Sequence, residues 1–180
     1  MSEEVSVQPY TRYSGKVVGL GSFTYNPKFI PDGFTLIGNA INRETEDRLI
    51  SLIEEGKNIE LKEIMRCIAA EFEGELNCKL NEYTFGKIKL GEGMPPEKED
   101  SKYYNPCVVV INMGSDIELI LTDTITKKGY PIMLPRRSMF LLQDKKFKFT
   151  RTIKKGNEDK IGNQTFYRSN RYSLVFKSRK

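Results

Sequence analysis

The chain has 180 residues, enough for one domain with a full hydrophobic core and too few for two of ordinary size. Hydrophobic residues make up 38% of it, no apolar run approaches the roughly 20 residues of a membrane span, and the acidic N-terminus lacks a secretory signal. With a net charge of +5 and no histidine, the sequence predicts a cytoplasmic protein without a membrane segment and excludes every catalytic system that needs an imidazole.

The first part of the chain is irregular. Residues 1–30 are polar, with scattered Tyr, Phe and Gly, and predict an irregular N-terminal arm with one short strand at 16–20. Residues 34–41 are apolar and predict a strand that leads into the folded domain. We therefore place the domain at residues 31–180.

Two helices are expected next. Asn42 is a suitable N-cap and is followed by acidic residues in the first turn, where they favour the helix dipole; Gly56 is expected to end this helix. The second helix begins after Asn58, carries apolar residues at steps of three and four, and is expected to stop at Gly74.

From residue 77 the pattern changes to short β-strands separated by turn residues. Two helices followed by about eight strands predict an α+β fold, with a double-stranded β-helix (jelly roll) core and two N-terminal supporting helices. The predicted strands are 77–85, 107–113, 117–122, 131–134, 138–143, 147–153, 163–167 and 171–177.

Three blocks of this β region look familiar. The first is LNEYTFGKIKLGEGMPPEKED, and the second runs from INMGSDIELIL through YPIMLPRRSMFLL to KKFKFTRTI. The third is NRYSLVFKSRK. In this order they resemble the motifs of the AlkB family of Fe(II)/2-oxoglutarate oxygenases, and among them the homologue that modifies wobble uridine in tRNA. The resemblance covers roughly residues 31–180 and implies the same jelly-roll fold.

The iron-ligand positions depart from this family. The resemblance places its two histidines at Glu97 and Arg151 and its aspartate at Glu99. Such an iron site needs two imidazoles and one carboxylate, whereas an arginine is permanently charged and donates no lone pair. We therefore expect no metal, no cofactor and no oxygenase activity, and ion pairs of Glu97 and Glu99 with Arg151. The alternative is a weak divalent-ion site made of the two carboxylates.

The 2-oxoglutarate pocket is partly retained. The resemblance assigns Asn81, Tyr83, Arg171 and Lys177 to it, but Lys177 stands where the family has an arginine. A lysine is a point charge and makes no bidentate fork to a carboxylate. The four residues are expected to be either the remnant of an anion pocket or ordinary structural residues of the barrel.

Positive charge is concentrated in the second half of the chain. Residues 127–180 hold 16 Lys/Arg against 3 Asp/Glu. This asymmetry predicts one basic face that binds a polyanion, most plausibly RNA, although a solvated surface offset by the acidic first half is the alternative. If 147–153 is a strand, Phe147, Phe149 and Arg151 share one face, and Lys146 and Lys148 lie on the other. The RNA-binding candidates are Lys127, Lys128, Arg136, Arg137, Lys145, Lys146, Lys148, Lys154, Lys155, Arg168, Arg179 and Lys180.

Other chemistry has little support in the sequence. Cys67, Cys78 and Cys107 lack metal-ligand spacing and are expected to be reduced, buried thiols. The glycine-bearing segments contain no P-loop.

The functional prediction is a catalytically inactive AlkB-like protein that binds RNA in the translation machinery. The RNA is expected to be tRNA or rRNA, without a preference for DNA, and ribosomal proteins are further candidate partners. Such a protein would be a constituent or an occluding, inhibitory factor. The alternatives are a pseudoenzyme that supports a partner such as a tRNA methyltransferase and, less favoured, an oxygenase with a non-histidine metal site.

Overall fold

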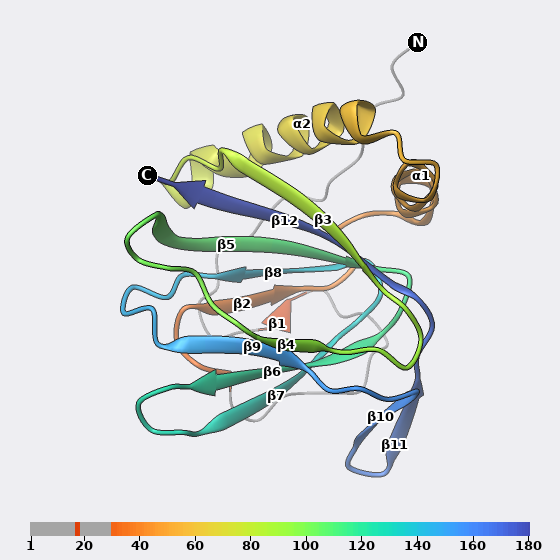
Figure 1. The fold of residues 1–180 in the computed structure, drawn as a ribbon, viewed down its shortest axis with the longest axis vertical. Coiled ribbons are helices and arrows are strands. Elements are labelled where there is room, and N and C mark those ends of the chain that lie inside the picture. Colours follow the sequence, from red (N-terminus) through yellow and green to blue (C-terminus); the bar gives the residue numbers. More distant parts are fainter. Residues whose placement is uncertain (1–16, 19–29) are drawn as a thin grey trace.

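The computed structural model describes residues 17–18 and 30–180, which form two stacked β-sheets with two helices against one of them (Figure 1). The predicted α+β jelly roll with two supporting helices is confirmed. In chain order the elements are β1 (Val17–Val18), β2 (Phe34–Ile37), α1 (Arg43–Glu54), α2 (Asn58–Leu76), β3 (Glu82–Ile88), β4 (Met94–Glu97), β5 (Tyr104–Met113), β6 (Ile117–Asp123), β7 (Gly129–Leu134), β8 (Ser138–Leu142), β9 (Phe149–Ile153), β10 (Glu158–Ile161), β11 (Gln164–Tyr167) and β12 (Arg171–Arg179).

The strand order is that of two facing sheets. The larger sheet has the order β1-β2-β8-β5-β12-β3 and the smaller one β4-β9-β6-β7, while β10 and β11 form a separate hairpin. All pairings are antiparallel except β1 with β2. Apart from β1, which lies inside the expected strand at 16–20, the predicted N-terminal arm falls outside the described residues.

Helix α1 begins as predicted, whereas α2 begins at Asn58 itself, with Lys57 as its N-cap, and ends later than predicted. The side chain of Asn42 accepts a hydrogen bond from the Thr45 amide at 2.7 Å, which confirms it as the N-cap of α1. Helix α2 continues past Gly74 because Leu76 extends its buried face, and it stops at Asn77, whose φ of 48° is left-handed. In the described part of the chain, no helix is long and apolar enough to cross a membrane.

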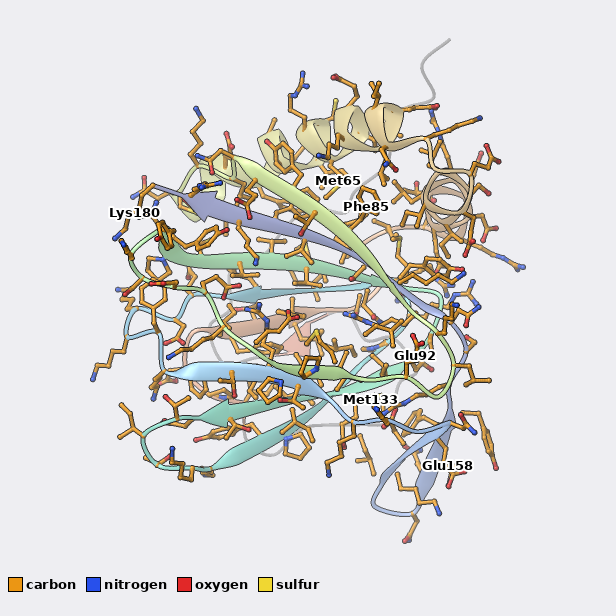
Figure 2. All side chains as sticks on the ribbon, viewed as in Figure 1. Met65, Phe85, Glu92, Met133, Glu158 and Lys180 are labelled. Atoms are coloured by element: carbon orange, nitrogen blue, oxygen red, sulfur yellow. The ribbon has the colours of Figure 1, made fainter. Side chains whose placement is uncertain are left out.

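Two hydrophobic cores lie on the two sides of the larger sheet. One packs α1 and α2 against its outer face, and Figure 2 shows Met65 of α2 and Phe85 of β3 in this layer. The other fills the space between the sheets. Strand β8 is buried along its whole length because Met139 and Leu141 join the first core while Phe140 joins the second.

Some strand boundaries differ from the prediction. The sequence reading missed β4, because the two prolines of Met-Pro-Pro-Glu disfavour a strand. They are tolerated here because β4 is the edge of the smaller sheet, where unpaired backbone groups are allowed. It also missed β10, whose polar residues form a short hairpin with β11. Strand β9 begins at Phe149, so Lys146 and Lys148 lie in the preceding turn and not on a strand face.

A buried carboxylate fixes α1 to the end of the barrel. Glu46 is fully buried and accepts hydrogen bonds from the Gly114 amide at 2.8 Å, Arg136 Nε at 2.8 Å and Arg137 Nη1 at 3.2 Å. Gly114 has a φ of 81°, and a Cβ atom there would lie 2.5 Å from the Asn170 carbonyl oxygen. This position therefore requires glycine.

We expect Glu46→Ala to lower the free energy of unfolding by about 2–4 kcal/mol, since three donors lose a charged acceptor. Chemical denaturation of the full chain measures this. Glu44→Ala is the matched control, because Glu44 is an exposed carboxylate in the same helical turn. Equal effects of the two substitutions would contradict the structural role of Glu46.

Candidate functional site

A cavity of about 100 Å³ lies between the two sheets, and four charged side chains line it. Glu97 comes from β4, Arg151 from β9, and Arg171 and Lys177 from β12. The alternation of β9 turns Phe149, Arg151 and Ile153 inward, and Glu97 is paired with Arg151 across the β4–β9 ladder. The remaining lining residues are Thr84, Met94, Val110, Leu119, Phe140, Ser173 and Val175.

Glu99 and Arg151 form a buried, bidentate ion pair beside this cavity. Both hydrogen bonds, Arg151 Nη1 to Glu99 Oε2 and Arg151 Nη2 to Glu99 Oε1, measure 2.7 Å, and both side chains are less than a tenth exposed. Lys177 Nζ lies 3.3 Å from Glu99 Oε1 as a second cation. We call these three residues the charge triad. The expected ion pair is thus present, but it involves Glu99 and not Glu97, whose side chain is exposed.

The triad keeps the carboxylate charged. Burial raises the pKa of Glu99, but hydrogen bonds and positive charge from Arg151 and Lys177 outweigh burial and hold the pKa below its ordinary value. A carboxylate that is ionised and already paired with two cations has no free charge to offer a metal.

Iron does not fit this site. The buried Glu99 carboxylate is held by the Arg151 fork, and the positive charge of Fe(II) beside that guanidinium would be repelled. Among residues 17–18 and 30–180, no three His, Cys, Asp or Glu side chains are grouped to hold a metal ion. The weak two-carboxylate metal site considered from the sequence therefore has no support in this geometry.

Arg171 is the buried cation without an acidic partner. Its Nε donates to Asn112 Oδ1 at 2.8 Å, and its two terminal nitrogens make no hydrogen bond to any described residue. Burial lowers the pKa of Arg171 to about 10, the charge of Arg151 adds to this effect, and Glu97 opposes it. A guanidinium in this state can bind a small anion in the cavity.

Two residues assigned to the 2-oxoglutarate pocket lie elsewhere. Tyr83 faces the helices, where its hydroxyl donates to the Leu80 carbonyl and its ring meets Phe176 edge-on. Asn81 pairs with the backbone of Arg179 at the sheet edge. Strand alternation instead turns Thr84 into the cavity, so the sequence reading put the β3 side chains on the wrong face. Only Arg171 and Lys177 of that group line the cavity.

The basic residues do not form one continuous face. Lys127 and Lys128 lie between β6 and β7, and Lys145, Lys146 and Lys148 lie between β8 and β9; both turns are at the same end of the barrel (Figure 1). We call these five residues the lysine-rich end. Lys154 and Lys155 follow β9 at the opposite end. In Figure 2 the labelled Lys180 and Glu158 mark these two ends, with Lys180 on the left and Glu158 on the right.

Several side chains that were predicted to contact RNA already make ion pairs or hydrogen bonds within the protein. Arg168 is buried and makes a two-point contact with Asp159, at 2.8 and 2.5 Å. It anchors the β10–β11 hairpin and is therefore removed from the predicted RNA contacts. Arg136 and Arg137 bind Glu46, as described above. At the C-terminus Arg179 lies 3.5 Å from Glu82, and Lys180 donates to the Ser101 carbonyl at 2.8 Å. The single basic face expected from the sequence is therefore reduced to the lysine-rich end.

A cleft of about 540 Å³ opens at the lysine-rich end. Lys145 and Lys146 are exposed on its wall and make no ion pair or side-chain hydrogen bond with any described residue, whereas Lys148 is 3.1 Å from Asp123. Lys128 lies over the ring of Tyr130, which also lines the cleft. The cleft is thus polar, and Lys145 and Lys146 on its wall have no ion pair with a described residue. Its other lining residues are Pro31, Asp32, Gly33, Gln143, Asp144 and Phe149.

We expect Glu99→Gln to lower the free energy of unfolding at neutral pH by about 3–5 kcal/mol, because Arg151 is left buried without a counter-charge. Since the pKa of Glu99 is lowered on folding, its contribution is present above the ordinary carboxyl pKa of about 4.3 and is lost as the pH falls through the folded value. Denaturation at several pH values should show a shallower acid loss of stability in the variant. Glu71→Gln, at an exposed carboxylate on α2, is the control and should leave both quantities nearly unchanged.

Of the comparisons with known proteins, the one with solved structures found a match, and this match supports the fold alone. No family model matches the sequence, and no curated protein matches it. Among solved structures, the crystal structure of a Pseudomonas putida prolyl-4-hydroxylase is similar, with a TM-score of 0.52 and 11% identity, covering 82% of this chain and 88% of that one. The chain therefore has the jelly-roll fold found in that hydroxylase.

Proposed function

We propose that this protein is a jelly roll that does not oxidise a substrate and instead binds RNA through its lysine-rich end. The observation that carries this proposal is the pair of exposed lysines, Lys145 and Lys146, on the wall of a broad cleft without internal partners. Lysines already bound to carboxylates have little charge left for phosphates, whereas these two retain theirs.

The neighbouring turn adds charge to the same surface. Lys127 and Lys128 are exposed, and the Thr124 amide donates to the Lys148 carbonyl at 2.8 Å, which holds the two turns together. Four exposed lysines on two linked turns favour a phosphate backbone over a single small anion. The ammonium groups of lysines do not distinguish one base edge from another, so we expect binding to depend on the shape and charge of the RNA.

The absence of oxidation is supported by the charge triad. The fork of Arg151 and the ammonium of Lys177 occupy both oxygens of Glu99, which leaves no arrangement of two nitrogen ligands and one carboxylate. The resemblance to AlkB-type enzymes of tRNA makes tRNA or rRNA the favoured RNA, and a cytoplasmic place in the translation machinery follows from the same resemblance.

Reversing the charge of Lys145 and Lys146 tests the RNA surface. We expect the double variant Lys145→Glu/Lys146→Glu to lower affinity for tRNA or an rRNA fragment by about tenfold or more. The slope of log affinity against log salt should become shallower by about 0.7–0.9 for each lost phosphate contact. Fluorescence anisotropy at several salt concentrations measures both.

The matched control is Lys154→Glu/Lys155→Glu, which changes the net charge equally at the opposite end of the barrel (Figure 1). It should have much the smaller effect. Equal losses in both variants would show only a response to net charge, and unchanged affinity in the first would contradict the proposal. RNase-resistant co-purification with one polypeptide would favour the protein-interaction alternative.

The cavity supports a second candidate function, the binding of 2-oxoglutarate or a similar dicarboxylate without its oxidation. The terminal nitrogens of Arg171 face this cavity without a partner among the described residues, and Lys177 adds positive charge. Burial would strengthen such a contact, because the competing solvent is excluded.

We expect 2-oxoglutarate, in the presence of EDTA, to raise the thermal unfolding midpoint if it binds. Stabilisation grows with ligand concentration and reaches about 2.7 kcal/mol at 100 times the dissociation constant. Its neutral dimethyl ester is the control and should have no effect, because it lacks the charge that Arg171 requires. An identical response to acid and ester, or no response to either, would remove this candidate and leave the RNA proposal untouched.

A further inference from the structure

Two cysteines that are far apart in the sequence meet beside the helices. Cys78 follows Asn77, the left-handed residue that ends α2, and Cys107 lies in β5. Both pack against the hydrophobic core between the helices and the larger sheet. The Cys107 side chain lies within hydrogen-bonding reach of the Cys78 thiol.

The connection that carries Cys78 is held in place. The Leu80 amide donates to Glu73 Oε1 at 2.9 Å, and the Tyr83 hydroxyl donates to the Leu80 carbonyl at 2.8 Å. Cys107 directly precedes Val108, which pairs with Leu142 of β8 and with Lys177 of β12. The two sulfur atoms thus meet because rigid elements bring them together.

The two thiols differ in access to solvent. Cys78 is partly exposed, whereas Cys107 is only 4% exposed. The hydrogen bond from Cys107 lowers the pKa of Cys78 and outweighs burial and the Glu73 carboxylate, which raise it. Cys78 is therefore the thiol that a small oxidant reaches first, and Cys107 is placed to react with the product.

We propose that Cys78 and Cys107 are an oxidative modification site, which a hydroperoxide converts into a reversible intramolecular disulfide. This inference is independent of the proposed RNA function. It assigns a chemical role to two residues for which the sequence alone indicated only reduced, buried thiols.

The reaction balances in two steps. The Cys78 thiolate attacks the outer oxygen of hydrogen peroxide, the O–O bond breaks, and the released hydroxide takes a proton to become water, leaving a sulfenic acid. The Cys107 sulfur then attacks the Cys78 sulfur, the S–O bond breaks, and the departing hydroxide takes the Cys107 proton as a second water. Two thiols are oxidised to one disulfide, and one peroxide is reduced to two waters.

The disulfide would tie the end of α2 to β5. It closes the segment 78–107, which contains β3, β4 and Glu99, and so restricts the unfolded chain more than the folded one. The expected consequence is a higher thermal unfolding midpoint for the oxidised protein, reversed by a thiol reductant.

Mass spectrometry of the full chain tests the site. The protein is treated with hydrogen peroxide, free thiols are alkylated, and the peptides are mapped without reduction. The Cys67→Ser variant is the matched background, because Cys67 is exposed on α2 and separate from the pair. We expect the Cys78–Cys107 linkage, with the loss of two hydrogen atoms, in wild type and Cys67→Ser alike, and the higher unfolding midpoint in both.

The single variants separate the two roles. Cys107→Ser should stop at a Cys78 sulfenic acid that dimedone traps, whereas Cys78→Ser should form no intramolecular linkage. Circular dichroism checks that each variant is folded. If either single variant is unfolded, the Cys78–Cys107 linkage in Cys67→Ser protein still tests the proposal. Folded Cys67→Ser protein that keeps two free thiols under peroxide, or that links only between molecules, would overturn the proposal.

Discussion

The bidentate contact between Glu99 and Arg151 is the interaction on which the interior of the barrel depends. A carboxylate and a guanidinium are each too costly to bury alone, so each requires the other at hydrogen-bond distance. Glu99 lies just after the end of β4, Arg151 lies in the middle of β9, and Lys177 adds a cation from the facing sheet. One ion-paired cluster therefore joins both sheets across the cavity. Arg151 and Lys177 together contact both carboxylate oxygens of Glu99.

Because buried carboxylates pair with nearby arginines, only part of the positive charge in the sequence is available to a binding partner. Arg136 and Arg137, the most conspicuous basic pair, neutralise a buried carboxylate and attach α1 to the barrel. Arg168 does the same for Asp159 under the β10–β11 hairpin. These arginines thus stabilise the fold through contacts with buried carboxylates, and the contact of Arg168 is forked, while Lys145 and Lys146 make no ion pair with a described residue. A formal charge count overstates the surface available to RNA because it ignores this division.

The fold also determines which turns become neighbours. Consecutive antiparallel strands return the chain to the same end of the barrel, so the β6–β7 and β8–β9 turns meet there and the turn after β9 lies at the other end (Figure 1). Lysines only six residues apart, Lys148 and Lys154, are consequently on opposite sides of the molecule. Conversely, Cys78 and Cys107 are distant in sequence, yet their side chains interact. Proximity along the chain is a poor guide to a shared surface in such a barrel.

The sequence by itself determined the class of fold, the start of α1 and most strands, because hydrophobic periodicity and the Asn42 cap are local signals. It also excluded an imidazole-based iron site, since composition alone settles that point. Only the tertiary structure decided that Glu99 and not Glu97 pairs with Arg151, that Tyr83 faces the helices, and that Arg168 is buried. The reason is physical: a shift of one residue reverses the face of a strand side chain, and ion-pair partners are chosen by distances in space that no local pattern encodes.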